Sequence, residues 1–152
     1  MPPYLKDDHA DGHASGSGWF SEYGPEQTRP FRALRAWATL AHLGRAGAAA
    51  LVSRTVAVAA ELGRLVDQAP DLERAAPVVT SIVAFRCRPP GLTESQADAL
   101  NAAIPAAVQR RGRAFLTGTV LAGRPVLRAC LIHPGTVEDD LAILLDEIRA
   151  VI

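Results

Sequence analysis

Lysine is almost absent from this chain of 152 residues. Lys6 is the only lysine, and the remaining 15 of the 16 basic residues are arginine. A reaction that requires a lysine amine must therefore use Lys6 or a lysine of another chain. There is also no basic surplus, because the formal net charge is zero. Nucleic-acid binding depends on an excess of positive charge that neutralises phosphates, so the composition argues against a nucleic-acid partner.

Aromatic residues and long apolar runs are scarce as well. Apolar residues make up 49% of the chain but aromatic ones only 5%, so alanine, leucine and valine must form most of the core. The length fits one domain. Arg45, Arg54 and Glu61 interrupt the alanine-rich region, which excludes a membrane-spanning run. The N-terminus lacks the basic and apolar segments of a signal peptide, and we therefore expect a cytoplasmic protein.

Short motifs of known chemistry are missing too. The sequence has no CxxC, no HExxH, no nucleotide-binding glycine motif and no credible Ser/His/Asp arrangement. His9 and His13 lie near carboxylates, but no helical periodicity would hold them together, so a metal site is not predicted. Cys87 and Cys130 both lie in strand-like runs and are expected to be buried free thiols.

The first half of the chain predicts two helices and two strands. Residues 1–18 are polar and glycine-rich and are expected to be mobile. Apolar periodicity then predicts a helix that begins after an N-cap at Thr28 and ends at Gly44, and a second over residues 45–68. Strands are predicted over residues 72–76 and 78–87, the latter apolar on both faces as a central strand is.

The second half predicts a helix, a hairpin and a last helix. Thr93 and Gln96 fit a capping box, and Pro105 should kink or split the helix that they open. The hairpin comprises residues 115–121 and 125–132, and Thr136 with Asp139 is expected to cap the last helix. This order predicts an α+β fold, with an antiparallel sheet of about four strands and helices packed on one face.

Arg128 is the most informative single residue. It alternates with Val126, Cys130 and Ile132 on one face of the predicted strand, and all three are apolar. An unpaired buried charge is very costly, so the guanidinium must be paired or must face a cavity. One interpretation is an arginine at a sheet edge with its head in water. The other is recognition of a carboxylate, which the planar guanidinium suits.

Several stretches resemble the C-terminal part of the group II amino-acid decarboxylases that depend on pyridoxal phosphate, a family that includes aromatic-L-amino-acid, glutamate and histidine decarboxylases. The resemblance begins at Y-L-K (residues 4–6) and extends to the end of the chain. It is carried by W-F-S-E-Y-G-P-E-Q-T-R-P-F-R-A-L-R-A-W (19–37), H-L-G-R-A-G (42–47) and V-L-R-A-C-L-I (126–132). The R-x-F-R-A-L-x-x-W core is fairly specific to the family. The resemblance implies the aminotransferase-like fold, with residues 19–152 as its C-terminal small domain.

The resemblance also implies what these residues do not supply. In the family a large domain precedes this region and provides the cofactor lysine in an H-K motif, the aspartate that pairs with the pyridine nitrogen, and most phosphate contacts. Lys6 matches the lysine of the Y-L-K loop instead. We therefore expect a fragment without the cofactor-binding domain, which alone binds no pyridoxal phosphate and is inactive.

Three residues acquire roles through the resemblance. Tyr4 matches the catalytic-loop tyrosine, a general acid that acts across a dimer. Arg128 matches a strand arginine that contacts the substrate carboxylate, and Arg29 resembles an arginine at the edge of the substrate-binding region. The parent enzyme would be a carboxy-lyase for an L-amino acid, with the large domain and a second subunit as partners and exposed apolar surface that favours self-association. The alternative is a free-standing α+β interaction or ligand-binding module.

Overall fold

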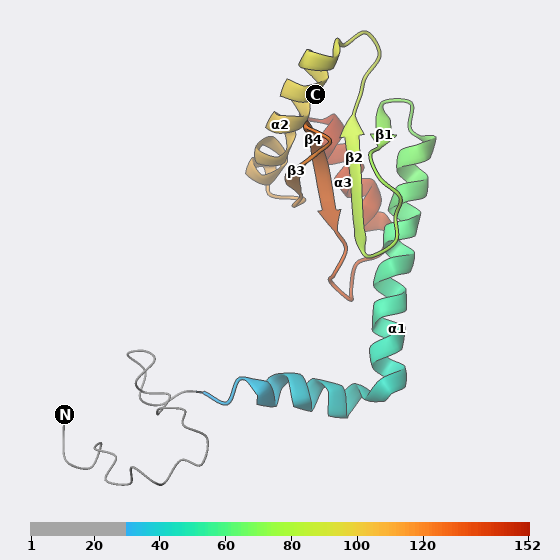
Figure 1. Cartoon of the computed structure of the whole chain (residues 1–152), viewed down its shortest axis with the longest axis vertical. Helices are drawn as coiled ribbons and strands as arrows, with labels where there is room; N and C mark the ends of the chain where they lie inside the picture. Colours follow the sequence, from blue (N-terminus) through green and yellow to red (C-terminus); the bar gives the residue numbers. More distant parts are fainter. Residues whose placement is uncertain (1–29) are drawn as a thin grey trace, which may run out of the picture. The chain divides into compact units, whose positions relative to one another are not determined.

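The computed structural model describes residues 30–152. These residues belong to two compact units, and the boundary between the units in the sequence falls after His42. Each unit is considered by itself. Helix α1 (Ala33–Gln68) is labelled in Figure 1. It is interrupted at Gly44, whose φ of 63° and ψ of 179° lie outside the helical region. Glycine adopts a positive φ without steric cost, so Gly44 ends the first helix as predicted and the second begins after it. The predicted N-cap Thr28 and residues 1–18 lie outside the described residues.

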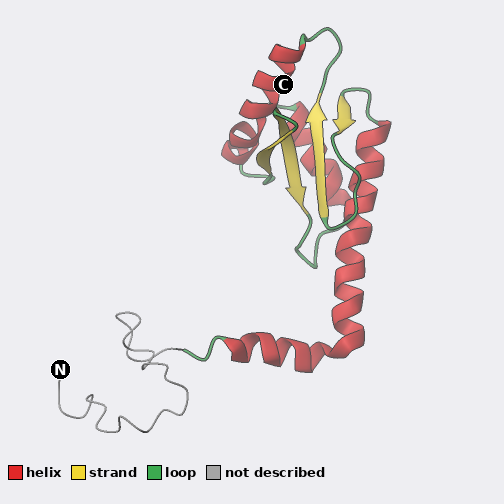
Figure 2. Ribbon diagram, in the orientation of Figure 1, coloured by secondary structure: helices red, strands yellow, loops and turns green. Residues whose placement is uncertain are grey.

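The second unit is built on four strands. Their bounds are β1 (Leu72–Arg74), β2 (Ile82–Cys87), β3 (Thr117–Leu121) and β4 (Arg124–Cys130). They form one antiparallel sheet in the order β1-β2-β4-β3, so that β2 and β4 are central (Figure 2). The predicted sheet of about four antiparallel strands is therefore confirmed, including the central position of β2.

The start of β2 and the hairpin turn differ from prediction by a few residues. The strand begins at Ile82 rather than at residue 78, because its ladder with β4 ends at the Ile82–Cys130 pair. Ala122 and Gly123 alone connect β3 to β4, with φ of 48° and 78°. Two consecutive positive φ values are the signature of the tight turn whose twist suits a hairpin.

One face of the sheet carries the core. Alternate residues of β2 and β4 point to this face and are buried together with residues of three helices. The contributors are Ala59, Leu62 and Val66 of α1, Val83, Phe85 and Cys87, Leu127 and Ala129, Ile104 and Val108 of α2, and Leu141, Leu144, Leu145 and Ile148 of α3. At Gly63 a side chain would come within 2.9 Å of Val78, so the glycine permits close packing of α1. Helices on one face of the sheet were predicted and are found.

Helix α2 (Glu94–Arg111) begins with the predicted capping box. The Thr93 N–H donates to Gln96 Oε1 at 2.9 Å, and the Gln96 N–H donates to Thr93 Oγ1 at 3.4 Å. Helix α2 continues through Pro105 for all 18 residues, so the expectation that this proline could split the helix is wrong. The ring of Pro105 lies near Gly118 of β3.

Asn101 is a buried polar residue of α2 that sequence reasoning missed. Its Nδ2 donates to the carbonyl oxygens of Cys87 at 2.8 Å and Ala97 at 2.7 Å, and its Oδ1 accepts from the Cys87 N–H at 2.8 Å. The amide thereby satisfies both backbone groups at the end of β2, which would otherwise be buried without partners. Asn101 therefore holds α2 against the last residue of the central strand β2.

Helix α3 (Glu138–Arg149) does not begin as predicted. Its N-cap is Val137, and the Asp140 carboxylate reaches back to accept the Val137 N–H at 3.0 Å. The prediction that Thr136 and Asp139 cap this helix is therefore wrong. The capping pair is one residue further along, with Val137 as the N-cap and Asp140 three positions after it. Val137 before this helix and Ile152 after it are 46% and 51% exposed.

A buried carboxylate joins α2 to α3. Glu147 is 1% exposed and accepts hydrogen bonds from Arg111 Nε at 2.5 Å and Arg113 Nη1 at 3.0 Å. These hydrogen bonds, with Arg111 the larger contributor, lower the pKa of the Glu147 carboxyl. A buried charge of this kind is tolerated because it is paired.

The two cysteines are both free but differ in environment, which corrects the expectation that both are buried. Cys87 is fully buried, whereas Cys130 is exposed on the opposite face of the sheet. Burial raises the pKa of the Cys87 thiol to about 11. A strand that is covered on one face only exposes alternate residues, which accounts for the difference.

We predict that one thiol per chain reacts rapidly with Ellman's reagent at pH 8. At that pH a thiol of pKa about 11 is almost entirely protonated, so Cys87 should react at least about 100-fold more slowly than Cys130. Cys130→Ser should remove the fast phase, and unfolding in guanidinium should release two thiols in the parent chain. Two fast thiols in the native chain would contradict the burial of Cys87.

Candidate functional site

The face of the sheet opposite the core is the candidate site. Arg128 lies on the central strand β4, where it is paired with Ala84 of β2 on one side and Thr117 of β3 on the other. Its side chain is exposed, as is that of Cys130 two residues later. The interpretation of Arg128 as an edge residue is therefore wrong, whereas its predicted position on an otherwise apolar strand face is found.

A hollow of about 350 Å³ lies on this open face. It is lined by Ala76, Pro77, Thr80, Ile82, Ala84, Thr119, Leu121 and Arg128. Apart from the guanidinium, the lining consists of apolar groups and two hydroxyls. Pockets for small ligands are typically apolar with a few placed polar groups, and their volumes start near 300 Å³. The composition and size of this hollow both fit that description.

No acidic residue lines this hollow, and among residues 30–152 no carboxylate forms an ion pair with Arg128. The guanidinium therefore presents a positive charge and a fork of N–H donors to whatever covers the open face. Planar carboxylates match this fork in a bidentate manner. Chemically, the arrangement is able to bind an anion and has no group positioned to transfer a proton.

A second strand arginine, Arg86, shows the opposite arrangement. It is 5% exposed, and its Nη2 lies 2.5 Å from Asp98 Oδ1 and its Nη1 3.6 Å from Glu94 Oε2. Arg124 at the start of β4 pairs with the same two acids. These ion pairs connect the first turns of α2 to one end of the sheet. The spacing of Glu94 and Asp98 on one helical face was the sequence signal that could have identified this cluster.

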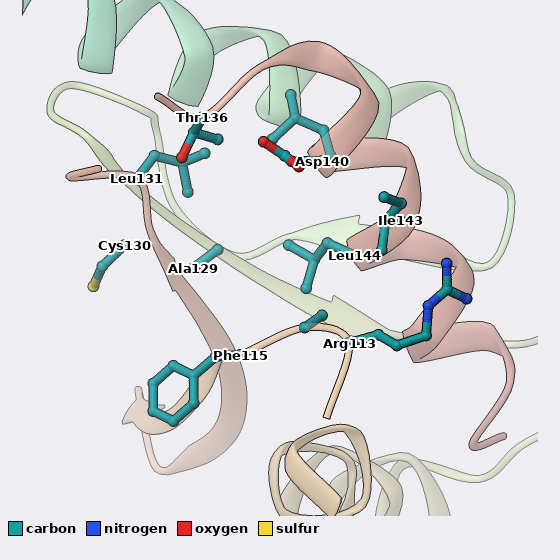
Figure 3. Close-up of a pocket in the computed structure, with 11 residues that line it drawn as sticks. Arg113, Phe115, Ala129, Cys130, Leu131, Thr136, Asp140, Ile143 and Leu144 are labelled. Atoms are coloured by element: carbon teal, nitrogen blue, oxygen red, sulfur yellow. The ribbon is translucent and has the colours of Figure 1, made fainter. Parts of the chain in front are cut away.

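A second hollow of about 280 Å³ lies between β4 and α3 (Figure 3). Ala129 and Leu131 contribute from β4 and the residue that follows it, and Leu144 from α3, while Asp140 and Arg113 are the charged residues at its edge. The Asp140 carboxylate is engaged by the Val137 N–H. This hollow therefore lacks the unpaired cation that distinguishes the open face.

In the described part of the chain, no group of three or more His, Cys, Asp or Glu side chains could hold a metal ion.

Of the residues predicted for the site, the structure places only Arg128. The other two, Tyr4 and Arg29, lie outside the described residues. The structure therefore neither joins these residues to Arg128 nor separates them from it.

None of the helices in residues 30–152 has the length and apolar character of a membrane span.

Comparison with known proteins identifies the relatives of the chain. No family model matches it. It is 29% identical over 151 residues to an aromatic-L-amino-acid decarboxylase of Bacillus atrophaeus, which covers 99% of this chain and 31% of the relative. It is also 31% identical over 110 residues to a phenylacetaldehyde synthase of Arabidopsis thaliana, covering 72% of this chain and 22% of the relative. The chain is a homologue of the C-terminal part of group II pyridoxal-phosphate-dependent decarboxylases.

Solved structures of these decarboxylases have the same fold. A structure of Oryza sativa TDC with PLP and tryptamine superposes with a TM-score of 0.73 at 27% identity, covering 81% of this chain and 27% of that one. The glutamate decarboxylase domain of a Vibrio parahaemolyticus enzyme gives a TM-score of 0.73 at 24% identity, which supports the fold alone; this match covers 82% of this chain and 26% of that one. The sheet and its helices therefore belong to the aminotransferase-like fold. The chain spans less than a third of the length of the relatives it matches.

Proposed function

We propose that these residues form the C-terminal small domain of a pyridoxal-phosphate-dependent enzyme that decarboxylates an aromatic L-amino acid. The observation that supports this most is the match over 151 residues to an aromatic-L-amino-acid decarboxylase. The unpaired Arg128 on the open face is consistent with it, because an amino-acid substrate supplies a carboxylate. Pyridoxal phosphate, when bound to such an enzyme, acts as the electron sink of the reaction.

The described residues do not fit the cofactor. They contain no lysine, and no cluster of free cations suited to a phosphate lies among the residues that line the hollows. The cofactor would therefore be held by the preceding large domain, and the open face would pack against that domain. Val79, Ile82 and Ile132, which are 80%, 41% and 72% exposed, would be covered in that contact.

In this proposal each candidate residue has one task. Arg128 binds and orients the substrate carboxylate from the sheet side. Arg29 contributes to the same substrate-binding region. Tyr4 acts in the active site of the partner subunit as a proton donor to the substrate carbon, which a phenol held close to its target is able to do. The assembled enzyme would be a cytoplasmic dimer.

We expect the 152 residues alone to bind no pyridoxal phosphate specifically and to have no decarboxylase activity. Titration with the cofactor, followed by dialysis, should leave no saturable visible absorption band. Lys6→Ala is the control, because Lys6 is the only amine of a lysine available. A band that survives dialysis in the parent chain and disappears in Lys6→Ala would contradict the assignment of the cofactor to another domain.

We also expect this chain to self-associate at micromolar concentration. Phe31, just before α1, and Leu34, Trp37 and Leu40 in the first part of this helix have exposed fractions between 47% and 71%. Contiguous exposed apolar surface of this kind is rare on monomers. Sedimentation velocity should show concentration-dependent association, and Trp37→Glu should weaken it. A clean monomer that binds no hydrophobic dye would argue against an interface on this helix.

A further inference from the structure

The residues around Arg128 indicate the chemical nature of the ligand group that accompanies a bound carboxylate. We infer that the hollow on the open face accepts the apolar group of a monocarboxylate, and that Ala84 and Thr119 set the size of the group it admits. The inference rests on the proposed function, in which Arg128 binds the carboxylate itself. It adds to that function a site for the remainder of the ligand and two residues that determine specificity.

The charge of the lining excludes other ligand classes. Arg128 is the only charged residue that lines the hollow. A dicarboxylate would place its second charge against Ile82 and Leu121, where no cation compensates for the lost water. A basic ligand would find no acid and would face the charge of Arg128. An apolar group, by contrast, gains free energy from leaving water along the same walls.

The position of Ala84 explains its proposed role. Ala84 is directly opposite Arg128 in the β2–β4 ladder, and the Cβ atoms of such pairs lie about 4.5–5.5 Å apart. A larger side chain at this position would occupy the space beside the stem of the arginine. Thr119 lines the same hollow from β3, on the other side of β4. Ala84 of β2 and Thr119 of β3, which is opposite Val126, therefore keep the hollow open on the two sides of β4.

The test uses the 152-residue chain and methyl chemical shifts of Ile82, Ala84, Thr119 and Leu121 in NMR titrations. We expect 3-phenylpropionate to bind at least about fivefold more tightly than acetate, because its phenyl group is removed from water. We expect 3-phenylpropionamide and glutarate to bind at least fivefold more weakly than 3-phenylpropionate. Arg128→Met should abolish the response to all carboxylates. Arg110→Met changes an exposed arginine of α2 outside the hollow and should alter nothing.

Filling the hollow separates the two proposals. Ala84→Leu should remove the preference for 3-phenylpropionate over acetate while leaving the binding of acetate unchanged. Thr119→Leu, on the neighbouring strand, should do the same, and serves if the first variant does not fold. Equal affinities of acetate and 3-phenylpropionate in the parent chain, or unchanged preference in a folded variant, would overturn the inference and leave the role of Arg128 standing. Absence of any response of the four methyl-bearing residues to carboxylates would overturn the inference and also the proposed contact of Arg128.

Discussion

Phe85→Ala is expected to lower the free energy of unfolding by about 3–5 kcal/mol, the range measured for truncation of buried aromatic residues. Phe85 is fully buried at the middle of the central strand β2, opposite Leu127 of β4. Truncation removes apolar contacts on the helical side and leaves a cavity that the surrounding strands cannot close. A loss of this size is a large part of the 5–15 kcal/mol that stabilises a typical domain.

Phe115→Ala provides a matched control for this prediction. Phe115 is 73% exposed, so the same change in side chain should alter stability by no more than about 0.5 kcal/mol. Urea denaturation of both variants and the parent chain measures the two values, with unchanged slopes as a check on two-state behaviour. Similar losses for the two variants would show that Phe85 is not the centre of the core.

The order of elements could be predicted because each was marked locally. Two such local signals are confirmed by the structure: the capping box of Thr93 and Gln96, and the helix-ending Gly44. Each depends only on residues within one or two helical turns. Other boundaries were missed where a distant partner decides the outcome. The start of β2, for example, depends on where its ladder with β4 ends.

The same distinction applies to the candidate site. Sequence reasoning selected Arg128 because a charge on an apolar strand requires an explanation. Arg86 meets the same criterion but was not selected, and the structure shows it paired with Asp98. Periodicity places both arginines on strands, but it does not reveal which of them lies beside the acids of a helix elsewhere in the chain. Only the packing of α2 on one end of the sheet separates the structural arginine from the available one.

The largest effect on activity is expected for Arg128→Met in an enzyme that joins this chain to a large cofactor-binding domain. Hydrogen bonds to charged groups contribute about 1.5–3 kcal/mol, so kcat/KM should fall roughly 10- to 100-fold. In the isolated chain the same substitution should change the free energy of unfolding by no more than about 1 kcal/mol, because Arg128 is exposed and has no acidic partner among the described residues.

Arg86→Met is the matched control for this prediction, because it removes an arginine that is paired within the chain. It removes a nearly buried guanidinium and leaves Asp98 and Glu94 with fewer cationic partners, so it should destabilise the isolated chain clearly more than Arg128→Met does. Urea melts of the two variants measure stability, and steady-state kinetics of the joined enzyme measure the effect on the substrate. If Arg128→Met cost several kcal/mol in the melt, the arginine would be holding the sheet together. The loss of activity would then report misfolding, and Arg128 would no longer be a candidate for the substrate contact.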